Sequence, residues 1–382
     1  MEFIDLKAQF EQISAEIDSR VKAVLEHGAY ILGPEVSELE DQLADYLKVS
    51  HCITCANGTD ALQLALMALG VGAGDTVLCP SFTFAATAEA VALVGATPMF
   101  VDIDSRSFNI CNSSLKRTID SARGEGRRLK AIIAVDLFGA PADYDHIQAT
   151  ADQNGLDLIC DNAQGFGATY KGRRTGAYGR VTTTSFFPAK PLGCFGDGGA
   201  LFTNDAELAK KLASLRVHGK GIDKYDNVCI GMNSRLDTIQ AAILLAKLPI
   251  YEVELKKRRF IADRYSKALS SILTVPSIEQ EVESVWAQYT VMAENEQERA
   301  KFISALSAGN VPTAIYYSRP VHLQNAYSSC PRDPAGLAST EEVAQRVFSL
   351  PMHPYLMEED VDHVVASAMN AVDGGRIVRK NS

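Results

Sequence analysis

The chain has 382 residues, of which 47% are hydrophobic and 22% charged, an ordinary globular balance with length for two or three domains. Its formal net charge of −10 argues against a nucleic-acid-binding protein, which would carry basic clusters. No apolar run approaches the roughly 20 residues that span a bilayer, and the start, Met-Glu-Phe-Ile-Asp, lacks the basic residues of a signal peptide. We therefore expect a cytoplasmic protein with no membrane and no nucleic-acid partner.

Two amphipathic helices open the chain. Apolar residues at helical spacing from Phe10 to Leu25 predict the first, and residues 35–47 predict the second. From about residue 50, short continuous apolar segments alternate with helical ones. Such segments indicate strands buried on both faces, as in a mostly parallel central sheet between helix layers. The expected strands are 77–79, 98–102, 131–135, 158–160, 182–187 and 199–203.

The last third of the chain predicts a different architecture. A long charged helix is expected over residues 234–269, with a kink or break at Pro249. Residues 285–291 alternate like a strand with one solvated face, and a helix follows over 299–308. We therefore expect an α/β protein of two domains. Residues 1–245 would hold the N-terminal helices and a large α/β domain, and residues 246–382 the linking helix and a small α+β domain.

The most informative segment is Ser185-Phe-Phe-Pro-Ala-Lys190, which a glycine-rich stretch over 196–199 follows. The residues before Lys190 are apolar or hydroxylic, and poor solvation disfavours the charged form of an amine. A partly neutral lysine can form a Schiff base with the aldehyde of pyridoxal phosphate (PLP). An isolated lysine at a strand end would more simply be a surface residue, but three upstream segments supply what the cofactor needs.

The cofactor ring needs a carboxylate opposite its pyridine nitrogen, because a protonated ring accepts electrons from carbanions. Asp161 comes just after the apolar strand that ends at Cys160, where open α/β sheets place ligand-binding groups. Gln164, three residues on, is in reach of the phenolic oxygen. Taken alone, Asp161 could instead be a helix N-cap.

The phosphate and the ring face need two further groups. Gly58 allows a tight turn before a helix, Thr59 or Asp60 can cap that helix, and its free N–H groups favour a dianion. Phe84, between a strand and a helix, can stack on the pyridine ring, although an isolated phenylalanine here would more simply be a core residue. Phosphate loop, aromatic residue, aspartate and lysine each fall at an element boundary.

These segments, in this order, resemble the sugar-nucleotide aminotransferases of the DegT/DnrJ/EryC1/StrS group, on the fold-type I scaffold of aspartate aminotransferase. The resemblance extends from Phe3 to Pro354 and includes a segment that starts at Asn233. Residues 191–199 and 233–240 look most similar to bacterial enzymes that aminate C3 of a UDP-linked N-acetyl-3-ketoglucosaminuronic acid. The segments that carry the resemblance are 58–61, 80–84, 161–164, 185–190 and 233–237.

The resemblance implies a PLP-dependent transfer of an amino group from L-glutamate to the C3 keto group of the sugar nucleotide, for bacterial surface polysaccharide. Lys190 and Asp161 would be catalytic, with Lys190 also moving the proton, and the kinetics would be ping-pong. The resemblance adds Ser185 to the cofactor contacts, and it places Asn233 on the phosphate of the partner subunit in a homodimer with shared sites. No metal is implied.

The resemblance implies that Tyr316, Tyr317 and His322 line the sugar pocket, and Arg235 is a candidate counter-charge for the substrate. The guanidinium of Arg235 would match the sugar carboxylate with two parallel hydrogen bonds. Three positions depart from the family. Asn162 replaces the common Ala after Asp161, Asp136 stands where a His or another small polar residue is usual, and Tyr316 stands where His is common.

Other functions compete with this one. A C4 aminotransferase acting on another keto-sugar nucleotide stays open. A sugar dehydratase of the same scaffold would have His in place of Lys190, and a non-catalytic regulatory protein would be expected to lose Lys190 or Asp161. A nicotinamide dehydrogenase lacks its G-x-G-x-x-G here. The C-x-x-C segment from Cys52 to Cys55 is explained by strand alternation, without a second pair to suggest a metal.

Overall fold

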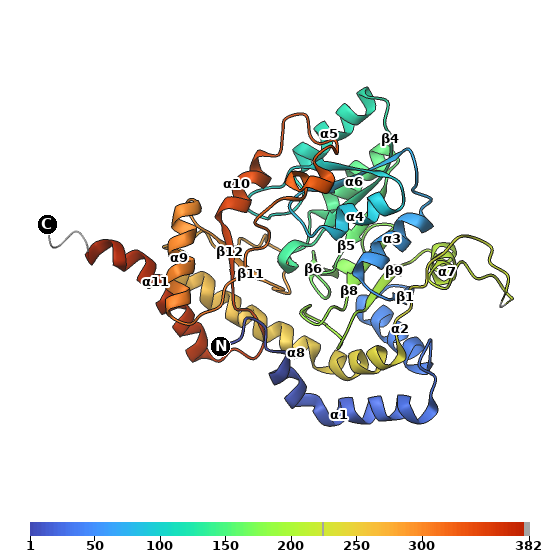
Figure 1. Ribbon diagram of the computed structural model, residues 1–382, viewed down its shortest axis with the longest axis horizontal. Helices are drawn as coiled ribbons and strands as arrows, with labels where there is room; N and C mark the ends of the chain where they lie inside the picture. Colours follow the sequence, from blue (N-terminus) through green and yellow to red (C-terminus); the bar gives the residue numbers. More distant parts are fainter. Residues whose placement is uncertain (224, 378–382) are drawn as a thin grey trace.

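The computed structural model describes residues 1–223 and 225–377, with side chains to residue 372. Its centre is a seven-stranded sheet in the order β1-β9-β8-β5-β4-β2-β3 (Figure 1). Only β9 runs against its neighbours. The predicted mostly parallel sheet is confirmed. The strands are β1 His51–Cys55, β2 Asp75–Pro80, β3 Thr97–Val101, β4 Arg128–Val135, β5 Asp157–Asp161, β8 Val181–Ser185 and β9 Gly199–Thr203.

Helices cover this sheet because its strands are apolar on both faces. One core joins the sheet to α3, α4 and α7, and another joins it to α5 and α6. Each helix follows a strand along the chain, as in the βαβ units that build parallel sheets. The helix bounds are α3 Gly58–Ala68, α4 Ala86–Leu93, α5 Asn112–Gly124, α6 Tyr144–Asn154 and α7 Ala206–Leu215.

Three further helices pack together beside the sheet: α1 Leu6–His27, α2 Pro34–Leu47 and the long α8 Thr238–Leu269. Figure 1 shows α1 lying along α8. The predicted break at Pro249 does not occur, since α8 runs unbroken through it. Leu245 and Tyr251, on either side of the proline, are buried in one core with α2, and this packing offsets the hydrogen bond that proline cannot make.

The C-terminal part has its own core, formed by residues between Ile261 and Ala368. Strand β11 Tyr289–Met292 pairs antiparallel with β12 Val347–Leu350 beside α9 Glu296–Ala308 and α11 Glu358–Ile377. The solvated face expected on the first strand is wrong, because all four β11 residues are buried. The smaller elements are β6 Thr169–Tyr170, β7 Arg173–Arg174, β10 Val282–Glu283 and the 3-10 turns Leu137–Gly139, Thr175–Ala177, Val321–Leu323 and Asn325–Tyr327.

The division at residues 245 and 246 stays a proposal, and two features bear on it. The boundary falls inside α8, which continues from one core into the other. Helix α10 Ala338–Arg346 belongs to the C-terminal third of the chain, yet its Val343 and Ala344 lie in the core of the large domain. The C-terminal segment therefore returns to the large domain.

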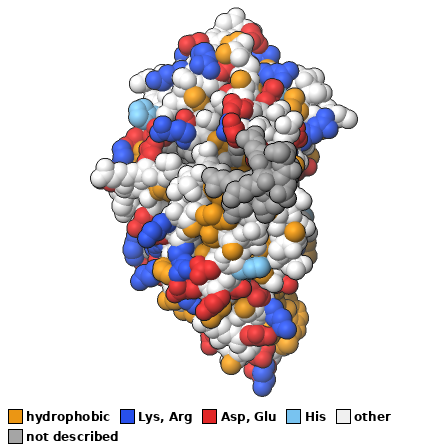
Figure 2. All heavy atoms as spheres, turned by 90° about the vertical axis from the view of Figure 1, so that its left-hand side faces the viewer, with side chains coloured by type: hydrophobic (Ala, Val, Ile, Leu, Met, Phe, Trp, Pro, Cys, Tyr) orange, Lys and Arg blue, Asp and Glu red, His pale blue; other side chains and the backbone are white. Residues whose placement is uncertain are grey.

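The surface is mixed in charge. In the face that Figure 2 draws, acidic and basic side chains lie side by side with scattered hydrophobic ones. Among the helices of the described residues, none is both long and apolar enough to cross a membrane.

Candidate active site

Two oppositely charged side chains meet at the carboxyl end of the parallel strands. Asp161 is the last residue of β5, and Lys190 lies in the turn after β8, the neighbouring strand. The charge of each shifts the pKa of the other, so the two side chains lie within electrostatic reach. The structure brings together the residues that the sequence predicts as the catalytic pair, at the sheet edge where open α/β folds bind ligands.

Burial dominates the electrostatics of this pair. Burial lowers the pKa of the Lys190 amine, and the negative charge of Asp161 opposes that shift. Burial also raises the pKa of Asp161, against the N–H of Ala163, the charge of Lys190 and the hydroxyl of Thr87. The carboxylate accepts from Ala163 N at 3.1 Å and from Thr87 Oγ1 at 3.3 Å. The pair can therefore supply an amine with an increased neutral fraction, the form that attacks carbonyl groups.

Gln164 is held in one amide orientation. The N–H of Phe138 donates to its Oε1 at 2.7 Å, and its Nε2 donates to the hydroxyl of Tyr317 at 3.1 Å. The donor end of the amide is thereby turned to the side of the site where Tyr317 lies. Burial raises the pKa of Tyr317, so its hydroxyl stays protonated. The structure thus brings a predicted cofactor contact, Gln164, against a predicted substrate contact, Tyr317.

The start of α3 forms a cradle for an anion. The predicted cap at Thr59 or Asp60 is wrong: Asn57 has the extended backbone of an N-cap, and its side chain accepts from Asp60 N at 2.8 Å. The N–H groups of Gly58 and Thr59 stand in the first turn, where a helix offers them no acceptor. A Cβ on Gly58 would lie 2.7 Å from the Cβ of Ser185. Free amides and a hydroxyl therefore adjoin, as a phosphate requires.

Phe84 lies at the open side of the site. Its side chain is 58% exposed, which excludes the alternative of a core position. Its ring centroid is 6.4 Å from that of Tyr317, at an interplanar angle of 39°. Phe82, two residues earlier, is fully buried instead. Stacking of Phe84 on a cofactor ring stays a prediction, and the residue is free to make that contact.

Two further predicted sugar contacts, Tyr316 and His322, differ in their burial. Tyr316 is half-buried, with its ring 6.4 Å from that of Phe3. His322 is only 2% exposed. Its Nδ1 lies 2.7 Å from Ser81 Oγ and its Nε2 lies 3.2 Å from Glu341 Oε1. Because both ring nitrogens are engaged, the expected sugar contact of His322 is not supported: the residue anchors its turn to the end of β2.

Asn233 and Arg235 lie in the loop before α8. Asn233 is exposed and Arg235 is half-buried. Both line a cavity of about 450 Å³, and none of the described residues that line it belongs to the Lys190 cluster. The structure therefore groups these two side chains with each other. The remaining lining residues are Ala56, Gly196, Asp197, Asp237 and Gln240.

One residue that sequence reasoning missed supports the lysine turn. Lys247 of α8 is only 1% exposed. Its amine donates to Gly193 O at 2.6 Å and lies 4.2 Å from the centroid of the Phe195 ring. Gly193 follows Lys190 by three residues, so a side chain of α8 holds the turn that contains Lys190. The signal was a single lysine within the apolar helical segment 241–248.

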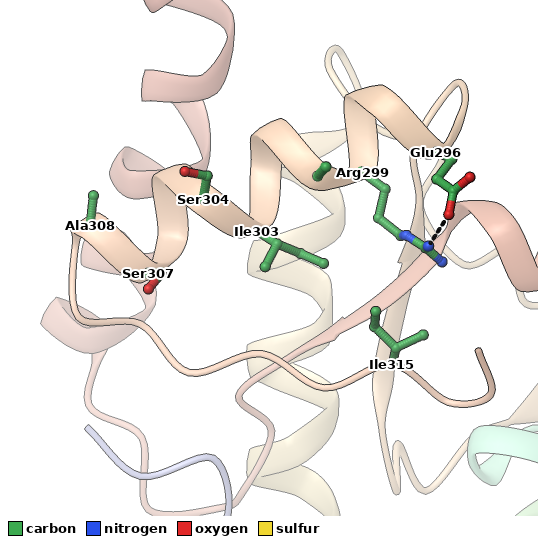
Figure 3. Close-up of a pocket in the computed structure, with 8 residues that line it drawn as sticks. Glu296, Arg299, Ile303, Ser304, Ser307, Ala308 and Ile315 are labelled. Atoms are coloured by element: carbon green, nitrogen blue, oxygen red, sulfur yellow. Dashed lines mark hydrogen bonds and ion pairs between the residues drawn. The ribbon is translucent and has the colours of Figure 1, made fainter.

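A pocket away from the strand ends offers no comparable chemistry. It has a volume of about 710 Å³ and lies along α9 (Figure 3). Its arginine, Arg299, is already paired with Glu296 at 3.2 Å and donates to Ala344 O at 2.8 Å. Ile303 and Ile315 supply apolar walls. The pocket therefore presents no unpaired charge for a ligand.

The Lys190 site fits pyridoxal phosphate. The amine and the carboxylate required at the two ends of its ring lie within electrostatic reach of each other, and the space left by the missing Cβ of Gly58 is walled by Ser185. These features are independent of each other, because they come from β5, the turn after β8 and the start of α3.

Curated relatives match over almost the whole chain. A protein of Pseudomonas aeruginosa, named UDP-2-acetamido-2-deoxy-3-oxo-D-glucuronate aminotransferase, is 48% identical over 97% of this chain and 100% of its own length. A protein of Acidithiobacillus ferrooxidans, named as a 3-aminotransferase of UDP-N-acetyl-3-dehydro-α-D-glucosamine, is 40% identical over 97% of this chain and 98% of its own.

Two solved structures are also similar to this chain over almost its whole length. A DegT/DnrJ/EryC1/StrS aminotransferase from Brucella abortus is 51% identical, with a TM-score of 0.95 over 97% of this chain and 99% of its own. NtdA from Bacillus subtilis, solved with the bound cofactor PMP, is 29% identical, with a TM-score of 0.88 over 97% of this chain and 83% of its own. The family pattern itself matches residues 11–369. The chain belongs to the DegT/DnrJ/EryC1/StrS aminotransferase family.

Proposed function

We propose that this protein is a PLP-dependent aminotransferase that transfers the amino group of L-glutamate to the C3 keto group of UDP-2-acetamido-2-deoxy-3-oxo-glucuronic acid. The observation that carries the proposal is the pair of half-buried Lys190 and buried Asp161 beside the anion cradle of Gly58 and Ser185. The substrate rests on the relatives from Pseudomonas aeruginosa and Acidithiobacillus ferrooxidans, since the names of both state a sugar oxidised at C3.

The geometry of the site supports a set of proposed cofactor contacts. Pyridoxal phosphate supplies an aldehyde that condenses with amines and a ring that takes up the electron pair of a carbanion. Lys190 would bind the aldehyde, and Asp161 would hold the proton on the ring nitrogen. The N–H groups of Gly58 and Thr59 and the hydroxyl of Ser185 would bind the phosphate. Asp60, Phe84 and Gln164 complete the proposed set, Gln164 through its Nε2 donor.

Lys190 would also move the proton. Burial lowers the pKa of its amine, which increases the neutral fraction that can accept the proton from Cα of the amino donor. Burial raises the pKa of Asp161, and the N–H of Ala163, the charge of Lys190 and the hydroxyl of Thr87 oppose this shift by favouring the charged form. The two proposed roles are distinct: Asp161 would hold the proton on the ring nitrogen, and Lys190 would carry a proton between two atoms.

Recognition of the sugar nucleotide would fall to the open side of the site. The Arg235 guanidinium would pair with the carboxylate of the sugar acid, and Tyr316 and Tyr317 would line the sugar. Asn233 is exposed in one chain, as expected of a residue that completes the phosphate site of a partner subunit in a homodimer. A cytoplasmic location and a product used for surface polysaccharide belong to the same proposal.

A panel assay tests this function. The purified protein would be given PLP, L-glutamate and UDP-linked keto sugars that differ in the position of the ketone, C3 or C4, and in a carboxylate or hydroxymethyl group at C5. Formation of 2-oxoglutarate should be fastest with the C3 ketone that carries the carboxylate. A protein that binds PLP but prefers a C4 ketone would overturn the proposed substrate, and a protein without a visible cofactor band would overturn the cofactor.

A further inference from the structure

Two buried polar side chains are hydrogen-bonded to each other next to the strand end that carries Asp161. Asp136 directly follows β4, Asn162 directly follows β5, and neither is exposed to solvent. Asn162 Nδ2 donates to Asp136 Oδ2 at 2.6 Å. These are two of the positions at which the sequence departs from the family that it resembles. Because the two side chains touch, the two departures form one structural feature.

The carboxyl group of Asp136 is fixed by neutral donors. Besides Asn162, the N–H of Ala142 donates to it at 2.9 Å and the hydroxyl of Tyr144 donates at 2.6 Å. Burial raises the pKa of Asp136 to about 6, against these three hydrogen bonds. Asn162 in turn donates to Thr175 Oγ1 at 2.5 Å. Asn162 Oδ1 has no hydrogen-bond partner among the described residues, and the hydrogen bonds made by Asn162 Nδ2 and by both carboxylate oxygens of Asp136 hold the network in a single arrangement.

The turn after Asp161 is shaped around this pair. A Cβ added to Gly165 would lie 2.5 Å from the Cβ of Asp136 and 2.9 Å from Asn162 Nδ2. The N–H of Gly165 donates to Asn162 O at 3.0 Å. A side chain at position 165 would therefore displace one member of the pair, and the turn can close only with glycine there.

The same two segments hold the groups that face the site. The N–H of Asp136 donates to Asp161 O at 3.0 Å. Two residues on, the N–H of Phe138 donates to Gln164 Oε1 at 2.7 Å. Segment 136–138 is thus bonded both to the backbone of Asp161 and to the side chain of Gln164. A shift between the segments would move both groups, and small displacements of positioned groups cost large factors in rate and affinity.

We propose that Asp136 and Asn162 act as one coupled positioning pair, which sets the turn 161–165 so that Asp161 and Gln164 are aligned for the cofactor. This inference rests on the proposed function. Neither residue is assigned a step in the reaction. Their effect reaches the cofactor only through the turn that they hold, and it depends on the contact between the amide and the carboxylate.

An exchange of the two residues tests the coupling. Asp136→Asn sets an NH₂ group against the NH₂ group of Asn162, and Asn162→Asp sets a carboxylate against the carboxylate of Asp136. Each single variant should raise the dissociation constant for PLP, titrated into the apoprotein by fluorescence, about tenfold. The double variant restores one donor and one acceptor, so its dissociation constant should return to within about threefold of wild type.

A matched control separates positioning from stability. Asp333 is a buried carboxylate beside α5 and β3, held by Ser114, Arg117 and the N–H of Ala335. Asp333→Asn should lower the melting temperature of the apoprotein as the single variants do. Its dissociation constant for PLP and the pH midpoint of its visible absorption band should match wild type, whereas the Asp136→Asn variant should change both.

Three results would contradict the proposal that Asp136 and Asn162 act as one coupled positioning pair. One is a double variant that binds PLP as weakly as the product of the two single effects, which would make the residues independent. Another is a loss of melting temperature in Asp136→Asn with no change in PLP affinity or absorption. If Asn162→Asp fails to fold, a double variant no better than Asp136→Asn alone contradicts the coupling. Failure of wild type to take up PLP would instead contradict the proposed function.

Discussion

The two halves of the candidate site are built in opposite ways. The cofactor half is assembled inside one chain from strand ends and a helix start, with Asp161 buried and Lys190 half-buried. The half that holds Asn233 and Arg235 lies on a loop before α8, in a cavity that Ala56 and Gly196 also line but that Lys190 and Asp161 do not. On the same loop, the side chains of Ile222 and Ile230 are 99% and 89% exposed.

This difference indicates which parts of the site a single chain can form by itself. A buried amine and a buried carboxylate need low solvation, which a folded core provides by itself. A phosphate or carboxylate contact made by an exposed residue needs a further surface to exclude water before it becomes strong. We therefore expect the cofactor half to depend on residues of one chain, and the Asn233 half to work only against a second copy.

Loss of the buried amine should have the largest effect. Lys190→Ala removes both the anchor and the proton carrier, so turnover should fall by at least about 10⁴-fold. The change deletes a buried charge and should leave the fold intact. Turnover would be measured as 2-oxoglutarate formed from glutamate, with circular dichroism as the check on folding. Activity near that of wild type would contradict the assignment of Lys190.

Loss of the buried charge at Asp161 should rank second. An amide cannot stabilise a protonated ring nitrogen, so Asp161→Asn should slow turnover about 100-fold or more at saturating PLP, and should weaken PLP binding. Thr87→Val is the matched comparison, since it removes only one hydrogen bond from the same carboxylate and should cost far less. An unchanged rate in Asp161→Asn would leave that residue as a local cap.

A change in the exposed half should act on the substrate alone. Arg235→Leu should raise KM for the uronic-acid sugar nucleotide about tenfold and for its neutral analogue about twofold at most, because only the acid can pair with a guanidinium. The affinity for PLP should stay constant. Equal losses with both sugars would assign Arg235 to the diphosphate or to a structural role.

The smallest expected effect is on the pH dependence of stability, through Lys247, which supports the turn that contains Lys190. Burial lowers the pKa of Lys247 from 10.5 to about 8. The unfolded chain therefore binds one more proton between these two values, and the stability of the folded protein should rise as pH increases from about 8 to about 10.5. Lys247→Met should lack this rise in denaturant unfolding measured at pH 8 and pH 10. An equal rise in both proteins would contradict the shift.

The sequence predicted the buried half more completely than the exposed half, for physical reasons. Apolar segments and glycine turns fix β5, β8 and α3, and these elements place Asp161, Lys190 and Gly58 in the order expected. The sequence pattern did not predict contacts between distant segments, such as the hydrogen bond from Lys247 to Gly193 or that from Asn162 to Asp136. It also assigned His322 to the sugar, because nothing local shows that Ser81 and Glu341 engage its ring.

Mixing two inactive variants tests most directly the claim that the two halves come from different chains. Asn233→Asp sets a carboxylate against the cofactor phosphate, and Lys190→Ala removes the amine. Under conditions in which subunits exchange, a hybrid dimer would contain one site with both defects and one with neither, so we predict that activity returns. If both residues served the site of their own chain, every hybrid site would keep one defect. Demonstrated exchange between two inactive parents without any recovered activity would contradict the account.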